Sequence, residues 1–374
     1  LRGPAVRRPT LWLHGASNGE LASARPVIEA LRAARPGLRI LVTCNTVTGR
    51  EMVRGWGLEA RLAPLDLRWI ARRLIRRQDI RALVTLEAEL WPNRHAALAE
   101  AGRPVILLGA RLSPGTAAGW GRFPALASQL MEAVTFASPQ DTGSARRLAE
   151  LGLPEERIGP VVAMKSLYRP ADLPAEPALE QGFDRGATWL AASTHPGEEE
   201  IALAAHAEAR ATRPGLRLIL APRHPRRGDE IARLVAQAGL TCDRRSAGEQ
   251  TGAAVLLADT MGEMDRWYAL AGTVFVGGSL AEHGGHTPFE PMAHGCALLH
   301  GPDVANFTAA YAALDEAGGA REVTDAASLC AAILALADPA ARAAMTDAAR
   351  AALAPEAGLD ALVADLLAAL DDQT

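Results

Sequence analysis

The sequence contains few lysine, cysteine and aromatic residues, and it has no long apolar run. Its 374 residues include one lysine, four cysteines and 4% aromatic side chains. The cysteines lie far apart without a CxxC spacing, which argues against a disulfide framework and favours a reducing compartment. No apolar run approaches the roughly 20 residues that span a bilayer. We therefore exclude a small disulfide-stapled fold and expect a protein that is soluble or peripheral to a membrane.

The charges also lack an excess of one sign. Lysine plus arginine number 39 and aspartate plus glutamate 43, which gives a formal net charge of -4. This balance excludes the broad positive field of a general nucleic-acid-binding protein, so we expect no nucleic-acid partner. Every basic residue except Lys165 is arginine. Because arginine has replaced lysine wherever the two are interchangeable, Lys165 is a candidate for a role that arginine cannot fill.

Apolar runs of strand length alternate with helix-like segments along the chain. Each run is followed by turn residues, which is the pattern of a parallel sheet covered by helices on both faces. The first series of runs covers residues 10–16, 38–44, 82–88 and 104–110, and the second covers 188–194, 216–222, 253–259, 273–279 and 296–302. The sequence therefore predicts an α/β protein with two doubly wound domains.

The change of pattern between the two series predicts the domain boundaries. We expect an N-terminal domain over residues 1–165 and a linker over 166–187, which is rich in proline and poor in periodicity. A second domain is expected over 188–350. The Ala-rich end shows helical spacing only, and we expect residues 351–374 to form a closing helix.

Acidic residues follow two of the predicted strands in the first half. In open parallel sheets, ligands bind at the carboxyl ends of strands. Glu20 follows the first run, and Glu87 and Glu89 follow the third, two positions apart in a segment expected to be extended. A carboxylate at this edge can take a proton from an attacking hydroxyl. The alternative for Glu20 is an acid in the first turn of a helix, and for one of the other two a solvated charge.

The strand ends of the second half have the residue types of a nucleotide site. Glycines after a strand let backbone N–H groups approach a phosphate, and a helix start and an arginine can share its charge. The candidates are Pro222, Arg223, Met261, Gly262, Glu263, Gly277, Gly278, Ser279, Thr287, Pro288, Phe289 and Glu290. The alternative is a zinc site made from His283, His286, His294 and Cys296. We predict no metal site, because two glycines separate the first pair and Cys296 opens an apolar run.

An arginine-rich stretch lies in the first half. Arg72, Arg73 and Arg76 alternate with apolar residues in a pattern typical of an amphipathic helix with a solvated basic face. The alternative is contact between these arginines and an anionic membrane surface.

Several blocks of the sequence, in this order, resemble the motifs of the Kdo transferases, which move 3-deoxy-D-manno-octulosonic acid (Kdo) from CMP-Kdo to lipid A. The first half has HGASNGE, EAELWPN and GARLS where the family has HAVSVGE, ETELWPN and NARLS. The second half has APRHP, DTMGE and GGSL unaltered, and GGHTPFEP where the family has GGHNPLEP. The resemblance extends from about residue 10 to residue 320.

The resemblance implies a GT-B glycosyltransferase with two facing Rossmann-like domains, the first for the acceptor and the second for CMP-Kdo. It implies that Glu20 is the general base, that Glu87 is a second active-site carboxylate, and that Lys165 is the lysine of the family's GNLK segment. The residues implied to hold CMP are Pro222, Arg223, Met261, Gly262, Glu263, Thr287, Pro288, Phe289 and Glu290. We predict an inverting, metal-independent transfer of Kdo to a lipid A precursor in lipopolysaccharide biosynthesis, with CMP-Kdo as donor substrate and no cofactor.

Two other functions agree with the same fold. One is a sugar-nucleotide epimerase, and the other is a non-catalytic paralogue that only binds CMP or lipid. The sequence departs from the family at Asn18, where an apolar residue is usual, and at Thr287, where asparagine is usual. The family's N-terminal membrane helix has no counterpart in the 13 residues before His14. We expect a location on the cytoplasmic side of the bacterial inner membrane, peripheral or with an anchor absent from this chain.

Overall fold

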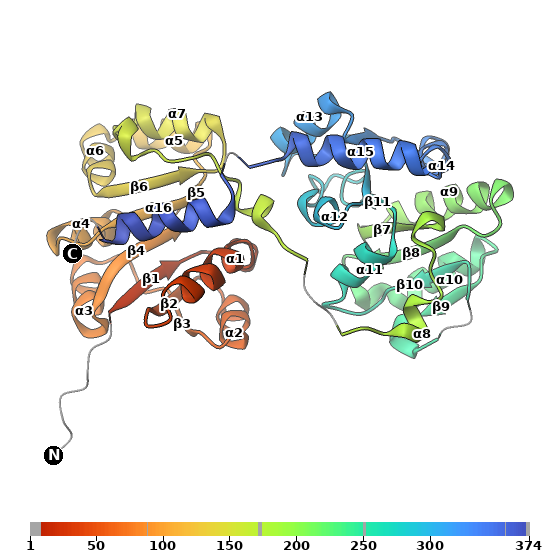
Figure 1. Cartoon of the computed structure of the whole chain (residues 1–374), viewed down its shortest axis with the longest axis horizontal. Coiled ribbons are helices and arrows are strands. Elements are labelled where there is room, and N and C mark those ends of the chain that lie inside the picture. Colours follow the sequence, from red (N-terminus) through yellow and green to blue (C-terminus); the bar gives the residue numbers. More distant parts are fainter. Residues whose placement is uncertain (1–8, 88, 171–173, 250–251, 356, 372–374) are drawn as a thin grey trace, which may run out of the picture. The chain divides into compact units, whose positions relative to one another are not determined.

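The computed structural model describes residues 9–87, 89–170, 174–249, 252–355 and 357–371 (Figure 1). The chain forms two compact units. The first comprises Leu1–Tyr168 together with Pro355–Thr374, and the second comprises Arg169–Ala354. Ala88 of the predicted strand 82–88, residues 171–173 of the predicted linker and residues 372–374 of the predicted closing helix lie outside the described residues.

The first unit contains one parallel sheet of six strands with helices on both faces. The strands are β1 (Thr10–His14), β2 (Arg39–Cys44), β3 (Glu59–Leu62), β4 (Ile80–Leu86), β5 (Val105–Ala110) and β6 (Val134–Pro139). The helices are α1 (Asn18–Ala34), α2 (Val47–Gly55), α3 (Arg68–Gln78), α4 (Pro92–Glu100), α5 (Pro114–Gly121), α6 (Pro124–Glu132), α7 (Thr142–Glu150) and α16 (Leu359–Asp371), with the 3-10 turns η1 (Glu155–Arg157) and η2 (Met164–Leu167). The strand order β3-β2-β1-β4-β5-β6 is that of a doubly wound fold, with its switch point between β1 and β4.

The second unit contains a parallel sheet of seven strands. They are β7 (Thr188–Thr194), β8 (Arg217–Pro222), β9 (Cys242–Arg244), β10 (Val255–Leu257), β11 (Thr273–Val276), β12 (Ala297–His300) and β13 (Ala320–Glu322). The helices are α8 (Pro177–Glu180), α9 (Glu198–Thr212), α10 (Gly228–Gln237), α11 (Met264–Leu270), α12 (Phe289–Ala293), α13 (Thr308–Ala317), α14 (Ala326–Ala335) and α15 (Pro339–Ala352), with the 3-10 turns η3 (Arg185–Ala187), η4 (Pro225–Arg227) and η5 (Arg245–Ala247). In the order β13-β12-β11-β7-β8-β10-β9, the switch point lies between β7 and β11.

The predicted α/β class and its parallel strands are confirmed. The strands that the sequence did not indicate are all edge strands of the two sheets. The four are β3, β6, β9 and β13, which lie at the two ends of each sheet. An edge strand has one neighbour and is exposed along its other side, so it needs no continuous apolar run. The segments EARL, CDR and ARE accordingly mix charged and apolar residues.

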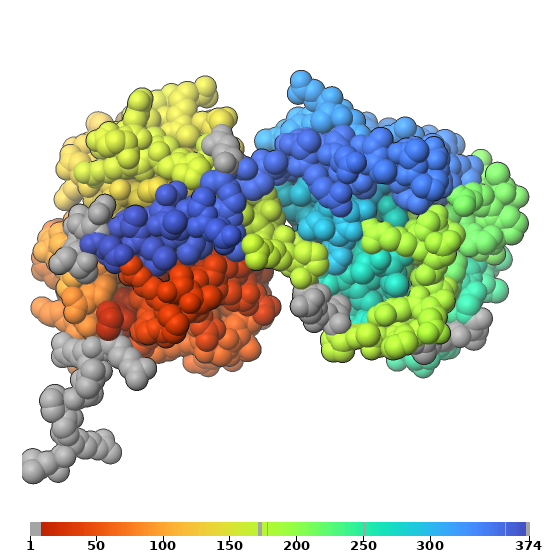
Figure 2. All heavy atoms as spheres, viewed as in Figure 1, coloured from red at the N-terminus to blue at the C-terminus, as the bar shows by residue number. Residues whose placement is uncertain are grey.

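The C-terminal helix returns to the first unit. Leu359, Leu362, Val363 and Leu366 of α16 are buried in the same core as β1, β2, β4 and α1. Figures 1 and 2 show α16, in blue, lying on the first unit among elements from the beginning of the chain. The Ala-rich end is therefore divided, because α14 and α15 belong to the second unit and α16 to the first.

The unit boundary differs from the predicted linker over residues 166–187. Leu167 is buried in the core of the first unit, and Leu179 is buried in a core of the second, where Phe183 packs against the same cluster. These apolar residues attach most of the described segment to one unit or the other, so the chain passes between units at Tyr168 and Arg169. Proline content alone does not show this, because a proline-rich segment can still bury its apolar side chains.

No single helix among the described residues is long and apolar enough to cross a membrane. The pair α14 and α15 together satisfies the length and composition of a span, but the two are bent by 103° at the break between them.

Two fully buried histidines make the stability of the protein sensitive to acid. His206 on α9 accepts a hydrogen bond at Nδ1 from the Trp189 indole N–H (3.1 Å), and its Nε2 lies 3.1 Å from the Ala254 carbonyl oxygen. These partners require the neutral ring with its proton on Nε2. Burial lowers the pKa of His206 to about 4, and burial does the same to the pKa of His95 on α4.

We expect the urea concentration at the midpoint of unfolding to decrease as the pH is lowered from about 7 to about 5. Ordinary carboxylates hardly titrate in this pH range. The folded state lowers both histidine pKa values below the ordinary 6.5, so the unfolded chain takes up protons first as the pH falls. The stability contributed by the neutral rings is complete above about pH 6.5 and is lost as the pH falls towards 4. His206→Gln should weaken this dependence, and a parent midpoint that does not change would contradict the expectation.

Candidate active site

The first candidate site lies at the carboxyl ends of β1 and β4, the switch point of the first sheet. Ser17 is the N-cap of α1, and its Oγ accepts a hydrogen bond from the Glu20 backbone N–H (3.2 Å). The Glu20 carboxylate accepts in turn from the Ala16 backbone N–H (2.7 Å) and the Ser17 hydroxyl (3.0 Å). Ser17 thus caps the start of α1, and the Glu20 side chain folds back onto the two residues that precede the helix. Glu20 is therefore a first-turn helix acid, and the same contacts hold its carboxylate at the strand end.

The surroundings of Glu20 raise the pKa of its carboxyl. Burial is the largest cause, and the negative charges of Glu87 and Glu89 add to it, while the hydrogen bonds from Ala16 and Ser17 act in the opposite direction. A raised pKa makes a carboxylate a stronger base, which suits proton transfer from a hydroxyl near neutral pH. Glu20 thus combines the position and the basicity that this chemistry needs.

Glu87 lies directly after β4 in a left-handed backbone conformation, with a φ of 51°. The segment is therefore not extended at this residue, which differs from the prediction that Glu87 and Glu89 lie two positions apart in an extended segment. The Glu87 N–H donates to the Leu108 carbonyl (3.1 Å), and its carbonyl accepts from the Arg111 N–H (3.2 Å). A non-glycine residue in this region costs roughly 1 kcal/mol, and such residues cluster at functional sites.

Glu89 is held more firmly than the sequence indicated. Its Oε2 lies 3.1 Å from His14 Nε2 and accepts from the Trp91 indole N–H at 2.6 Å. The hydrogen bond from His14 is the main cause that lowers the pKa of Glu89. Glu89 is therefore an anchored carboxylate, whereas the sequence left open that it is a solvated charge.

Asn18, one of the departures from the family motif, faces a neighbouring helix start. Its Oδ1 accepts hydrogen bonds from the Thr46 hydroxyl (2.8 Å) and the Thr48 hydroxyl (3.2 Å), and Thr46 is the N-cap of α2. The substitution therefore links the starts of α1 and α2 through polar contacts.

Lys165 lies in the first unit on η2. Its neighbours Met164 and Leu167 are buried in the core, η2 packs against α1, and the Ser166 hydroxyl donates to the Ala163 carbonyl (2.7 Å). Packing of these neighbours fixes the main chain of Lys165, and its side chain is half-buried.

The second candidate site lies at the carboxyl ends of β7 and β11, where the turn Gly277–Ser279 follows β11. A carboxylate of the protein itself occupies this turn. The buried Glu198 accepts hydrogen bonds from four backbone N–H groups, those of His195 (2.9 Å), Gly278 (2.7 Å), Ser279 (3.0 Å) and Leu280 (2.9 Å). The Gly277 N–H donates to the Ala192 carbonyl (2.8 Å). The structure thus corrects the prediction that these amides are open to a phosphate.

The absence of a side chain at Gly277 has a packing reason. A Cβ there would lie 2.8 Å from the carbonyl oxygens of Ala192 and Ser193, which is too close for any real contact. Glycine is needed because two backbone segments meet at this point.

The loop over residues 283–288 is fixed by neighbouring segments. The Gly284 N–H donates to the Asp303 carboxylate (2.6 Å), and the Asn306 side-chain amide donates to the His283 carbonyl (2.9 Å). The conformation of the loop predicted to hold the nucleotide is therefore set by the protein's own contacts.

The helix after this loop is short. Pro288 is the N-cap of α12, and α12 has five residues, the second of which is Glu290. The Phe289 N–H is directed to the Thr287 hydroxyl oxygen at 3.4 Å. Because the helix dipole is a sum over aligned peptides, one short turn supplies little positive potential. The start of α12 therefore offers an anion little stabilisation.

Pro222 and Arg223 follow each other at the end of β8. Pro222 is the last residue of the strand and is buried, and the Arg223 backbone N–H donates to the Thr194 carbonyl (3.0 Å). The Arg223 side chain is exposed, and its charge contributes to lowering the pKa of both His195 and His286. Arg223 is thus a cation at the edge of the second switch point.

A group of histidines lies at the same edge. The rings of His195 and His283 stack with centroids 3.9 Å apart, and the Nε2 atoms of His195 and His286 are separated by 3.0 Å. Burial, followed by the charges of its neighbours, lowers the pKa of His286 to about 4. Sequence reasoning named His283 and His286 but missed His195, although its place directly after β7 was a usable signal.

The turn Met261–Glu263 presents an apolar side chain to solvent. Met261 is 75% exposed, and Gly262 has a φ of 83°. The Glu263 carboxylate accepts hydrogen bonds from Arg245 (2.6 Å) and from the Thr260 hydroxyl, and the Arg245 contact is the main cause that lowers the pKa of Glu263. Glu263 thus stabilises the turn, while Met261 and Gly262 are its accessible part.

The residues of the zinc alternative do not form one group. His294 Nε2 lies 2.8 Å from Asp265 Oδ1, whereas Cys296 is buried with its Sγ 3.3 Å from the Tyr268 carbonyl oxygen. Within the ranges that the structure describes, no group of three or more His, Cys, Asp or Glu side chains is arranged to hold a metal ion.

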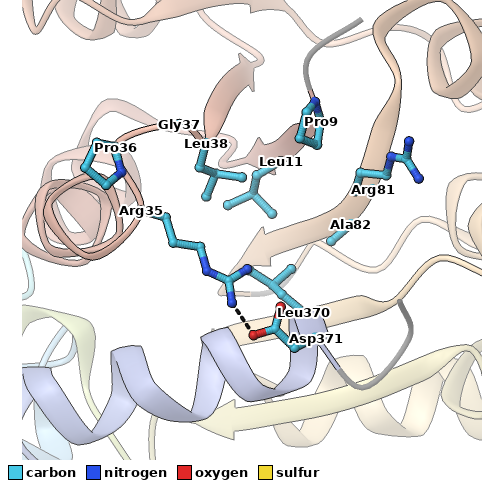
Figure 3. Close-up of a pocket in the computed structure, with 10 residues that line it drawn as sticks. All are labelled: Pro9, Leu11, Arg35, Pro36, Gly37, Leu38, Arg81, Ala82, Leu370 and Asp371. Atoms are coloured by element: carbon cyan, nitrogen blue, oxygen red, sulfur yellow. Dashed lines mark hydrogen bonds and ion pairs between the residues drawn. The ribbon is translucent and has the colours of Figure 1, made fainter.

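A cavity of about 500 Å³ lies near the amino-terminal ends of β1 and β4, at the end of the first sheet opposite to the candidate site (Figure 3). Its lining includes Pro9, Leu11 and Ala82 near the beginnings of β1 and β4, and an ion pair joins Arg35 to Asp371 across it. Because Glu20, Glu87 and Glu89 follow the other ends of these strands, the cavity is not part of the candidate site.

Replacement of Glu198 is expected to destabilise the second unit. Glu198→Ala would leave four backbone N–H groups without their acceptor, and we expect a loss of about 3 kcal/mol or more in the free energy of unfolding. Glu200→Ala changes an exposed residue of the same helix and should alter it by less than about 0.5 kcal/mol. Urea unfolding of both variants measures the difference, and similar small losses would contradict the assigned role of Glu198.

The two units define the class of the protein. Two Rossmann-like units with polar residues at their switch points make up the GT-B glycosyltransferases and the sugar-nucleotide epimerases that share their fold. A solved structure of a putative UDP-N-acetylglucosamine 2-epimerase from Listeria monocytogenes matches 97% of this chain and 96% of its own with a TM-score of 0.64 at 12% identity. Likeness at this identity shows the fold alone, and the predicted GT-B class is confirmed.

The sequence relatives decide between the activities that this fold supports. Residues 2–167 match the family model described as 3-deoxy-D-manno-octulosonic-acid transferase (kdotransferase). The 3-deoxy-D-manno-octulosonic acid transferase of Haemophilus influenzae is 34% identical over 85% of this chain and 76% of its own length, and that of Bordetella pertussis is 35% identical over 98% and 88%. The chain belongs to the 3-deoxy-D-manno-octulosonic acid transferase family and is a glycosyltransferase. The predicted family is confirmed, and the epimerase alternative is not favoured.

Proposed function

We propose that this protein transfers Kdo from CMP-Kdo to a hydroxyl of a lipid A precursor, with inversion at the anomeric carbon and without a metal ion. The observation that carries the proposal is the place of Glu20. It lies at the switch point of the first sheet, in the block that resembles the family motif, and its pKa is raised by burial and by neighbouring carboxylates.

In the proposed reaction, Glu20 takes the proton of the acceptor hydroxyl. The acceptor oxygen forms a bond to the anomeric carbon of Kdo, and the bond from that carbon to the phosphate oxygen of CMP breaks. Attack from the side opposite the leaving group inverts the anomeric centre. The negative charge of departing CMP is met by the side chains of Arg223 and Lys165, an electrostatic role.

The remaining proposed donor contacts come from the second unit. Met261 and Gly262 are accessible in their turn. Thr287–Glu290 span the end of the fixed loop and the first residues of α12. Because Glu198 engages the amides of the Gly277–Ser279 turn, we assign that turn the role of holding His195 and the loop in place rather than of binding phosphate.

The test is incubation with CMP-Kdo and tetra-acylated lipid A, followed by mass spectrometry of the lipid. We expect lipid carrying added Kdo, with CMP released in equal amount and no loss of activity in EDTA. An isomerised donor without acceptor would indicate the epimerase, and unchanged substrates would indicate a binding paralogue. Activity lost in EDTA and restored by zinc or magnesium would overturn the metal-independent mechanism.

A second proposal concerns location, which we infer to be the cytoplasmic side of the bacterial inner membrane. It is supported by exposed apolar residues just before and within α3, where exposed fractions range from 43% to 73%: Leu62, Leu65, Leu67 and Trp69. Arg73 and Arg76 lie on the exposed face of the same helix. Apolar side chains beside arginines are the combination that binds an anionic lipid surface. Arg72 contributes less than the sequence indicated, because it pairs with Glu100 at 2.6 Å.

Binding to vesicles with and without anionic lipid tests this surface. We expect binding to anionic vesicles that weakens with salt and with Arg73→Glu, Arg76→Glu and Trp69→Ser. Arg146→Glu makes the same charge change at an exposed residue of α7 and serves as the control. Binding that does not depend on salt, or that weakens equally in the control variant, would contradict the proposal and indicate that α3 is an ordinary solvated helix.

A further inference from the structure

A continuous chain of hydrogen bonds runs through the interior of the first unit to Glu89. The Trp12 indole N–H donates to the Thr43 hydroxyl oxygen at 2.7 Å, and that oxygen lies 2.9 Å from His14 Nδ1. On the other side of the ring, His14 Nε2 lies 3.1 Å from Glu89 Oε2. Trp12 and His14 are 0% exposed, and strand register places His14 beside Thr43. Side chains of the neighbouring strands β1 and β2 thus form a chain of contacts that ends at the Glu89 carboxylate.

The donors around Glu89 fix where the protons lie. Glu89 Oε2 also accepts from the Trp91 indole N–H at 2.6 Å, and the contacts of His14 and Trp91 lower the pKa of this carboxyl. An ionised carboxylate only accepts, so His14 Nε2 carries a proton directed to Glu89. His14 Nδ1 then either accepts from the Thr43 hydroxyl in the neutral ring or donates to the Thr43 carbonyl oxygen, 3.0 Å away, in the charged ring. Both arrangements hold Glu89 ionised and in one place.

The surroundings of Glu20 and Glu89 shift the pKa values of their carboxyl groups in opposite directions. Glu20 and Glu89 are held at the same end of β1, since the Ala16 N–H donates to Glu20 (2.7 Å) and His14 Nε2 lies 3.1 Å from Glu89. Burial is the main cause that raises the pKa of Glu20, and the negative charges of Glu87 and, less strongly, Glu89 add to it. Glu89 faces His14 and the guanidinium of Arg94, which act in the opposite direction. Lys165 is the charged residue of η2, which also packs against α1. Neighbouring acids with opposed environments are the pattern of one group that exchanges a proton beside one that stays charged.

We propose that His14 is a positioning residue for the transfer reaction, because it holds Glu89 as a fixed negative charge beside Glu20. The inference rests on the proposed function, in which Glu20 is the base. When the proton passes from the acceptor hydroxyl to a Glu20 carboxylate oxygen, Glu20 changes from negative to neutral and its repulsion with Glu89 disappears. The fixed charge thus favours the proton-accepting step, and it acts only if Glu89 remains ionised and in place.

Glu89→Gln tests the charge with little change of shape. We expect the acidic limb of the pH profile of kcat/KM, which reports the free enzyme's base, to move to lower pH by about half a unit or more. We expect kcat to fall about tenfold, because a weaker base accepts the proton less readily. Glu29→Gln removes a charge from an exposed part of α1 and should change neither.

A double-variant cycle tests whether His14 acts through Glu89. His14→Phe should move the limb in the same direction, and adding His14→Phe to Glu89→Gln should cause no further loss. If His14→Phe does not fold, Thr43→Val removes the hydroxyl on the far side of the ring and takes its place. The inference would be overturned if the losses of kcat in the two single variants multiplied in the double variant. It would also be overturned if the acidic limb of the pH profile did not move. Normal turnover of Glu20→Gln would instead overturn the proposed function, so the two failures are distinguishable.

Discussion

Glu20→Gln should reduce kcat for Kdo transfer at least about 100-fold, the usual contribution of a positioned base. The amide can still accept the Ala16 N–H and contact the Ser17 hydroxyl, so the cap of α1 and the fold should remain. What it cannot do is take a proton near neutral pH. Thermal unfolding and CMP affinity should therefore stay close to those of the parent while turnover is lost.

The matched control for this variant is Glu29→Gln on the same helix. Glu29 is exposed and forms an ion pair with Arg25 at 2.7 Å, so its replacement should leave kcat within about twofold of the parent. Steady-state kinetics with CMP-Kdo and a lipid A precursor measure both variants. Near-normal turnover of Glu20→Gln would remove Glu20 from the role of base.

Lys165→Arg should be disabling although it keeps the charge. An ammonium is a compact point charge, whereas the guanidinium is larger and planar and cannot occupy the same tight position. The flanking Met164 and Leu167 are buried, so the main chain cannot readily shift to make room. If Lys165 meets charge that develops as CMP leaves, the variant should lose kcat more than substrate affinity, because the lost interaction belongs to the transition state.

The control is the reverse exchange, Arg169→Lys, at an exposed position four residues further along the chain. We expect kcat and KM within about twofold of the parent for Arg169→Lys, and an unchanged melting temperature for both variants. Equal kinetics for Lys165→Arg and the parent would mean that Lys165 persists by chance and takes no part in the reaction.

Local patterns in the sequence were sufficient for the central strands and for Glu20. A strand buried on both faces must be apolar along its length, so β1, β4, β7 and β8 produce continuous apolar runs that can be recognised without a structure. The contacts that position Glu20 come from Ala16 and Ser17, which lie within four positions of it in the chain, so they are local. The family motifs are local in the same sense.

The less local features could not be predicted in this way. The role of Glu198 depends on backbone amides about 80 positions later in the chain, and that of Glu89 on His14, 75 positions earlier. Glycines after a strand agree equally with a phosphate-binding turn and with two backbones in close contact. Only the positions of Ala192 and Glu198 show that the Gly277–Ser279 turn is a place where two backbone segments are in close contact.

The sequence by itself determined the parallel α/β class, the family and the carboxylate at the first switch point, because each depends on residues close together in the chain. The tertiary structure decided the edge strands, the return of α16 to the first unit, the shortness of α12 and the separation of the zinc candidates. It also decided which carboxylates are anchored and which one is basic. The physical reason is that hydrogen bonds, burial and electrostatic repulsion depend on distance in space, and the fold brings together groups that the chain keeps far apart.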